Sequence, residues 1–245
     1  MKFSIFLIIL TFGVFKFQLL NAQEHVNSWF RTTVRIPIKN KLLIDNEFQL
    51  RRQNGFENRN PMDKPLVHSF RLWIHYQFGK SSKVLISPFA YFSSHPLIID
   101  AVDENSLTRG EKRFALAHLW TPSINSKWAL IFRNGLEYRV FSDYNLLRFR
   151  TRYGFSYKST EKIKFLFYGE YFLHLPNSIQ NNISDQFRGV GLLEYKFTKS
   201  IKLEFGYMFA HRQSTLSSTK WDEHNVMVYF TYSFLQHLNR KVKHN

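Results

Sequence analysis

The feature that most constrains this chain is a two-residue alternation of apolar and polar side chains. In the segment 145–158, Leu147, Phe149, Thr151, Tyr153, Phe155 and Tyr157 alternate with Arg148, Arg150, Arg152, Gly154, Ser156 and Lys158. A period of two places successive side chains on opposite faces of a β-strand. No stretch of helical period competes with it, so the sequence predicts an all-β fold.

Eleven segments carry this pattern. They are 29–39, 42–51, 66–78, 83–93, 111–120, 127–141, 145–158, 162–174, 185–198, 200–212 and 224–235. Most are at least as long as the roughly 9–11 residues with which a tilted strand crosses a bilayer. Pro88 predicts that the segment 83–93 is irregular or bulged.

The connections between these segments fall into two groups. Tight turns are expected at 39–41, 79–82, 159–161 and 198–200, and long polar loops at 52–64, 95–108, 175–184 and 213–222. Outer-membrane barrels have short periplasmic turns and longer extracellular loops. The sequence therefore predicts an antiparallel transmembrane β-barrel of about 10–12 strands. Because such barrels in bacteria have an even number of strands, we expect one strand to be missed or merged, within 52–64 or 95–110.

The first 22 residues have the order of a cleaved signal peptide. Met1-Lys2 is a short positive region, Phe3 to Phe15 is almost wholly apolar, and Ala22 is the small residue at the predicted cut. The alternative, a retained helical anchor, is disfavoured because Lys16 ends the apolar run short of a membrane span. We therefore expect an exported chain with a barrel at 23–235, a basic tail at 236–245, and an outer-membrane location.

Composition limits the partners and the chemistry. The chain has no cysteine, which excludes disulfides, thiolate metal sites and a lipid-modified cysteine. Aromatic residues make up 18% of the chain, as expected if lipid and its interfaces contact the strands. The formal net charge of +16 favours acidic partners. For an exported chain we expect outer-membrane lipids and lipopolysaccharide phosphates, and no nucleic acid.

The last segment alternates toward a closing aromatic residue. Phe230, Tyr232 and Phe234 share one face, which is similar to the terminal-strand signal that the barrel-insertion machinery recognises. We expect that machinery to be a partner.

The chain also resembles a known family. It has a signal peptide, Trp29 early in the first strand, a tight turn into a second strand that contains Phe48-Gln49-Leu50-Arg51, and about a dozen alternating strands. In these features it is similar to an uncharacterised outer-membrane barrel family of Gram-negative bacteria, known as a domain of unknown function. The resemblance covers the whole mature chain. It implies a barrel and no particular activity.

The polar face of the strands is unusually charged. A two-residue turn at 142–143 places Glu137 opposite Arg148 and Arg133 opposite Arg152, and Arg139 lies on the same face. A three-residue turn at 159–161 places Arg150 opposite Glu170. A three-residue turn at 39–41 places Arg35 opposite Asp45. This network either fills and rigidifies the lumen or forms an electropositive constriction for anions, with Arg148, Arg150 and Arg152 as its ladder. Arginines outnumber the carboxylates that can be placed, which favours a solvated lumen.

Catalytic arrangements are weak in this sequence. Glu194 and Glu204 face each other across the 198–200 turn, but we expect cations such as Arg188 or Arg212 to pair with them. No serine lies in a nucleophile pattern with a histidine, and no metal-ligand spacing or phosphate loop is present. The sequence predicts no enzyme, metal or cofactor.

Six aromatic residues near predicted strand ends are interpreted as a membrane-interface girdle. They are Trp29, Trp120, Trp128, Tyr144, Trp221 and Tyr232. Ligand stacking is the alternative.

The function favoured by the sequence is a narrow pore or uptake channel for small anionic or amphipathic solutes. The alternatives are a structural barrel with a plugged lumen and a soluble exported β-protein that binds a ligand.

Overall fold

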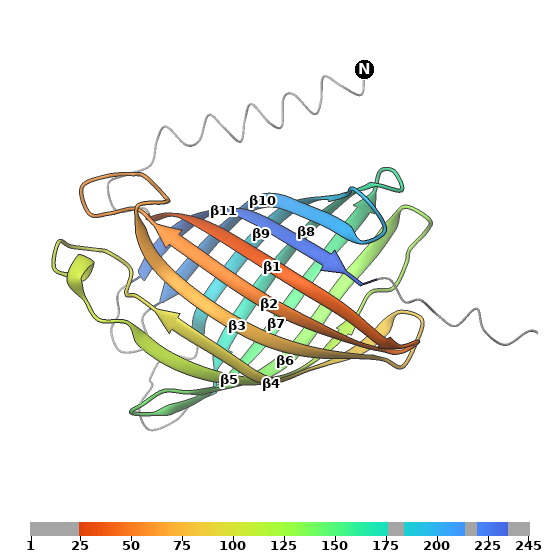
Figure 1. The fold of residues 1–245 in the computed structure, drawn as a ribbon, viewed down its shortest axis with the longest axis horizontal. Helices are drawn as coiled ribbons and strands as arrows, with labels where there is room; N and C mark the ends of the chain where they lie inside the picture. The colour runs from red at the N-terminus through yellow and green to blue at the C-terminus, as the bar shows by residue number, and fades with distance from the viewer. Residues whose placement is uncertain (1–24, 176–183, 214–219, 235–245) are drawn as a thin grey trace, which may run out of the picture.

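The computed structural model describes residues 25–175, 184–213 and 220–234, which form one closed β-barrel (Figure 1). In chain order the strands are β1 (His25–Lys39), β2 (Leu42–Gln53), β3 (Lys64–Gln77), β4 (Ser82–Ser94), β5 (Arg109–Trp120), β6 (Trp128–Val140), β7 (Asn145–Lys158), β8 (Ile163–His174), β9 (Ser184–Lys196), β10 (Ile201–Gln213) and β11 (Lys220–Ser233). Each strand pairs with its neighbour in sequence. The all-β barrel predicted from the alternation is confirmed. The predicted signal peptide and basic tail lie outside the described residues.

The barrel closes between its first and last strands. β1 and β11 run parallel, with His25 opposite Glu223 and Arg35 opposite Ser233. A parallel closing pair permits an odd number of strands, because both strands then start at the same end of the barrel. The expectation of a missed or merged strand was wrong for the described residues: the 95–108 connection contains only a 3-10 helix, η2 (Asp103–Asn105), and 54–63 is a loop.

The two ends of the barrel differ. The connections 54–63 and 95–108, together with the turn at 141–144, lie at one end, which we call the long-loop end (Figure 1). The turns at 40–41 and 78–81 lie at the opposite, tight-turn end. Within the described part of the chain, no helix is long and apolar enough to cross a membrane.

Three of the predicted registers are present. Glu137 pairs with Arg148, Arg133 with Arg152, and Arg35 with Asp45. The fourth was wrong by two residues, since Arg152, and not Arg150, lies opposite Glu170. The turn after β7 runs to Ile163, whose carbonyl accepts the Ser159 N–H at 3.0 Å, and is longer than three residues. The irregularity predicted at Pro88 appears as a register shift between Ser87 and Ala90.

The alternation sorts side chains between two environments. Large apolar residues cover the outside and are 38–54% exposed, among them Phe48, Phe78, Phe114, Leu116, Phe155, Phe167, Phe205 and Phe230. Charged residues such as Glu137, Arg148 and Glu170 are 2–6% exposed and point into the lumen. A polar interior and an apolar exterior reverse the arrangement of a soluble protein. The fold resembles an outer-membrane β-barrel in this respect.

Candidate functional site

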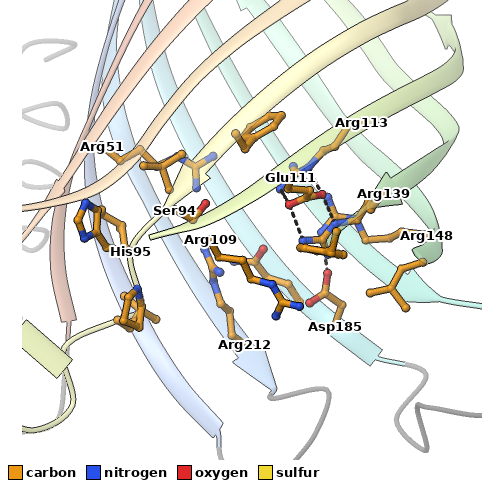
Figure 2. Close-up of a pocket in the computed structure, with 18 of the residues that line it drawn as sticks. Arg51, Ser94, His95, Arg109, Glu111, Arg113, Arg139, Arg148, Asp185 and Arg212 are labelled. Atoms are coloured by element: carbon orange, nitrogen blue, oxygen red, sulfur yellow. Dashed lines mark hydrogen bonds and ion pairs between the residues drawn. The ribbon is translucent and has the colours of Figure 1, made fainter. Parts of the chain in front are cut away.

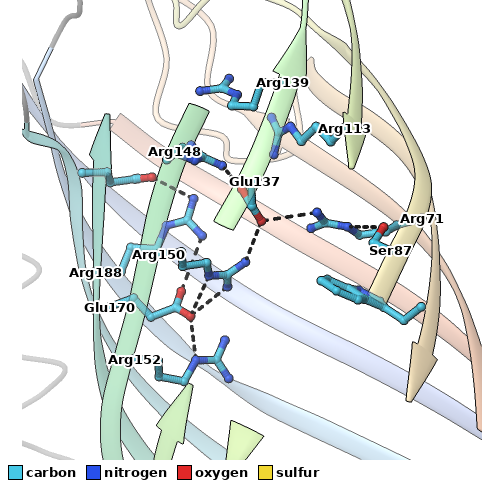
Figure 3. A network of polar contacts seen from close by, with 12 residues as sticks. Arg71, Ser87, Arg113, Glu137, Arg139, Arg148, Arg150, Arg152, Glu170 and Arg188 are labelled. Atoms are coloured by element: carbon cyan, nitrogen blue, oxygen red, sulfur yellow. Dashed lines mark hydrogen bonds and ion pairs between the residues drawn. The ribbon is translucent and has the colours of Figure 1, made fainter. Parts of the chain in front are cut away.

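The middle of the lumen is crossed by ion pairs that centre on Glu137 of β6. Its carboxylate accepts hydrogen bonds from Arg148 Nη2 at 2.5 Å and Arg71 Nη2 at 3.3 Å, and Arg150 Nη1 lies 3.5 Å away (Figure 3). These residues belong to β3, β6 and β7, so the contacts reach across the barrel as well as along it. A buried carboxylate is tolerated only with such partners.

Glu170 of β8 forms a second centre in the same network. Its Oε1 accepts from Arg152 Nε at 2.6 Å and Arg150 Nη2 at 2.8 Å, while Arg188 Nη1 lies 3.8 Å from Oε2. Phe172 is 1% exposed, and the Arg148 Cζ atom lies over its ring, 4.8 Å from the ring centroid. Aromatic faces help to hold guanidiniums that share too few carboxylates.

The arginine ladder is therefore bonded, contrary to the solvated lumen favoured by the sequence. Arg148, Arg150 and Arg152 each contact at least one carboxylate. The network encloses a pocket of about 100 Å³. The ladder closes the middle of the lumen instead of lining an open path.

A larger cavity, which we call the vestibule, opens at the long-loop end (Figure 2). Its volume is about 560 Å³, within the range of small-molecule sites. Seven arginines line it: Arg51, Arg109, Arg113, Arg139, Arg148, Arg188 and Arg212. Three carboxylates line it as well, Asp103, Glu111 and Asp185, so its lining carries a net positive charge.

Two of these carboxylates are engaged by arginines of the wall. Glu111 lies between Arg113 and Arg139, whose Nε atoms approach its Oε1 at 2.5 and 2.6 Å (Figure 2). Asp185 accepts from Arg148 Nη1 at 2.8 Å. Counting Glu111, Glu137 and Glu170 together, three carboxylates hold seven different arginines.

The rim of the vestibule is fixed by buried hydrogen bonds. Gln53, 1% exposed, donates from Nε2 to the carbonyl of Pro96 at 2.9 Å and accepts the Ile98 N–H at 3.3 Å. The start of the 95–108 loop is thereby held against β2. Burial, together with the nearby His68 and Arg52, lowers the pKa of His95 in this loop.

Two lumen arginines have no ion pair with any residue the structure describes. The guanidinium of Arg51 lies 3.5 Å from the Trp29 ring centroid, and that of Arg133 lies 4.8 Å from the Trp73 ring centroid. Arg51 lines the vestibule, whereas Arg133 lines only the inner pockets. Of these two arginines, only Arg51 therefore borders the vestibule.

The predicted pair Glu194 and Glu204 lies near the tight-turn end. The two residues are opposite each other, as predicted, and Lys202 Nζ lies 3.2 Å from Glu194 and 3.4 Å from Glu204. The expected pairing with Arg188 or Arg212 was wrong, because those arginines contact Glu170 and Glu223. A lysine, and not an arginine, therefore supplies the cation that the sequence analysis expected beside this pair.

The six aromatic residues predicted as a girdle divide into two groups. Trp120, Trp128 and Tyr232 are 38–44% exposed on the outside, near the tight-turn end. Trp29 is 7% exposed and packs in the lumen against Tyr229, and Tyr144 and Trp221 line the vestibule. The girdle interpretation was wrong for these three residues. Trp29 and Trp221 occupy positions in their strands whose side chains alternate inward, and the turn at 141–144 directs Tyr144 inward.

The other predicted residues have simple positions. Phe230, Tyr232 and Phe234 are 38–50% exposed on one outer face. Among the described residues, no group of three or more histidines, aspartates and glutamates is placed to hold a metal ion.

Several vestibule residues were not singled out from the sequence. Glu111 and Arg113 occupy inward positions in β5 that strand parity alone assigns. The contact between Arg71 and Glu137 has no such signal, because it joins β3 to β6 across the lumen. Only the closed barrel brings those two strands within reach.

These observations define a closed β-barrel of the outer-membrane type with a charged lumen. Residues 26–221 match the family described as "Protein of unknown function (DUF2490)", and the chain belongs to that family. Among solved structures, "Outer-membrane expressed OmpT of Vibrio cholerae" aligns at 12% identity with a TM-score of 0.37, over 75% of this chain and 61% of that one. The alignment thus spans about three fifths of that structure's length. A search of curated proteins gives no match.

Proposed function

We propose that the protein is an outer-membrane barrel that takes up small anionic or amphipathic solutes through the vestibule. The observation that carries this proposal is the vestibule lining, in which seven arginines accompany three carboxylates. A concave site with excess positive charge raises the local concentration of anions. Arginine-lined constrictions also favour anions over cations.

The apolar exterior supports the location. Exposed aromatic and aliphatic side chains surround the barrel, and a surface of this kind needs lipid around it. The proposed partners are outer-membrane lipids, lipopolysaccharide phosphates near the exposed Lys112 and Lys220, and the insertion machinery at Phe230, Tyr232 and Phe234. In this arrangement the long-loop end faces outward.

Membrane insertion is tested by heat-modifiability. In an outer-membrane fraction, the unboiled protein should migrate at a different position on a denaturing gel from the boiled protein, because a closed barrel resists detergent unfolding. A soluble periplasmic protein without a mobility shift would contradict the proposal.

Uptake is tested with two permanently charged solutes of similar size in proteoliposomes. Benzenesulfonate should enter slowly, because the Glu137 and Glu170 network has to rearrange, and phenyltrimethylammonium should stay outside. Protein-free liposomes provide the control. Equal entry of both ions would contradict an anion-selective path.

One observation favours a second function, a structural barrel with a plugged lumen. Each ladder arginine is held by a carboxylate, and the pocket that the network encloses is only about 100 Å³. If neither charged solute enters proteoliposomes that hold heat-modifiable protein, this second function replaces uptake.

A further inference from the structure

Two arginines at the floor of the vestibule share one aromatic ring. The Cζ atom of Arg51 lies 3.5 Å from the Trp29 ring centroid, and that of Arg188 lies 5.4 Å from the same centroid. They come from β2 and β9, which β1, β11 and β10 separate in the closed barrel. Two like charges held around one indole repel each other, and an anion between them would remove that repulsion.

Buried hydrogen-bond donors at the same place lack acceptors. Gln186 and Arg188 are 3% and 8% exposed, and the Arg188 Nη2 donates to Gln186 Oε1 at 2.8 Å. Gln186 Nε2, Arg188 Nε and Arg51 Nε have no hydrogen-bond partner among the described residues. Buried donors are nearly always satisfied in proteins, so three unsatisfied donors beside one cavity point to a missing acceptor.

An apolar wall faces the same cavity. Leu66, Val67 and Phe92 form a buried cluster, with Leu97 packed against it. All four residues also line the vestibule, as does Arg51, which is labelled in Figure 2. Small-molecule sites combine apolar walls with a few polar groups that fix orientation. The vestibule offers both to one solute.

We propose that the vestibule floor binds the oxyanion of a small organic molecule, a carboxylate or a phosphate monoester attached to an apolar group. The oxyanion lies between Arg51, Arg188 and Gln186, because guanidinium and amide donors match its oxygens. The apolar group lies against Leu66, Val67 and Phe92. The inference rests on the proposed uptake function and names its solute class and its binding residues.

The test measures binding of 4-phenylbutyrate and phenyl phosphate to the full-length barrel in lipid nanodiscs, by tryptophan fluorescence and calorimetry. Acetate represents the oxyanion alone and 4-phenylbutan-1-ol the apolar group alone, and empty nanodiscs correct for partitioning. Both amphipathic anions should bind saturably, at least about tenfold more tightly than acetate or the alcohol, because only they satisfy both parts of the site. Equal affinity for the alcohol would overturn the oxyanion site.

Arg133 provides a matched control for Arg51. Both are lumen arginines without an ion pair to a described residue, and each lies over a tryptophan, but only Arg51 lines the vestibule. Arg51→Gln should weaken 4-phenylbutyrate binding about tenfold or more, and Arg133→Gln should leave it within about twofold. Retention of the gel mobility shift shows that each variant folds. Unchanged binding in Arg51→Gln, or an equal loss in both variants, would overturn the assignment.

The two proposals fail in different ways. If 4-phenylbutyrate binds and depends on Arg51 while benzenesulfonate does not enter proteoliposomes, the site stands and uptake is wrong. If benzenesulfonate enters and Arg51→Gln binds 4-phenylbutyrate normally, uptake stands and the site is wrong.

Discussion

Replacing Glu137 with glutamine should lower the free energy of unfolding of the barrel by about 3–5 kcal/mol. Glutamine keeps the shape of the side chain and removes its charge. Arg71, Arg148 and Arg150 then lose a shared counter-charge at a position where Glu137 is only 3% exposed. The cost is large because three guanidiniums remain in the lumen with less compensation than before.

The measurement is urea unfolding of the liposome-inserted protein, followed by tryptophan fluorescence. Glu161→Gln is the matched control, because it removes the same charge from a residue whose side chain is 88% exposed and paired with Lys158 in the turn after β7. Exposed ion pairs contribute little, so the control should unfold as the wild type does. If both variants unfold at the same urea concentration as the wild type, the lumen network is not ordered as described.

A second substitution tests the cause of the loss. Among the described residues, Glu137 is the only carboxylate in an ion pair with Arg71, which is 7% exposed. Arg71→Met in the Glu137→Gln background should therefore recover part of the lost stability, since it removes a stranded charge and leaves an apolar side chain of similar length. Additive destabilisation by the two substitutions would show that packing, and not charge, dominates at this position.

The strands and much of the site could be predicted from the sequence, because side chains in a strand alternate and each position can face only inward or outward. All eleven predicted segments overlap an observed strand, and parity together with a two-residue turn placed Glu137 opposite Arg148. Turn length was harder to predict. The turn after β7 is longer than expected, so the residue opposite Glu170 is Arg152 and not Arg150. Arg150 Nη2 still lies 2.8 Å from Glu170 Oε1.

What could not be predicted depends on closure of the barrel. The parallel pairing of β1 and β11 has no local signal, and the rule of even strand number pointed away from it. Contacts across the lumen, such as that between Arg71 and Glu137, follow from the barrel radius and not from sequence spacing. The same limit explains Trp29, whose parity placed it with Arg31 and Arg35 while its residue type suggested an interface position.

The second large effect concerns the close approach of β9 and β10. A Cβ added at Gly206 would clash with the carbonyl oxygen of Gly191 and would lie 2.8 Å from Leu192 Cδ2. The oxygen belongs to the backbone of the neighbouring strand, so it cannot move aside without disturbing the ladder between β9 and β10. Gly206→Ala should therefore cost about 3 kcal/mol or more, as overpacking does in a close-packed interior.

Gly189 in β9 provides the contrast for this substitution, because a Cβ added there would meet nothing within 4 Å. Gly189→Ala should leave stability unchanged or raise it by up to about 1 kcal/mol, since alanine restricts the unfolded chain more than glycine does. The urea midpoints of the two variants should differ in that order, and the Gly206→Ala barrel should lose its gel mobility shift at a lower temperature. If Gly206→Ala proves as stable as Gly189→Ala, then β9 and β10 lie further apart than described.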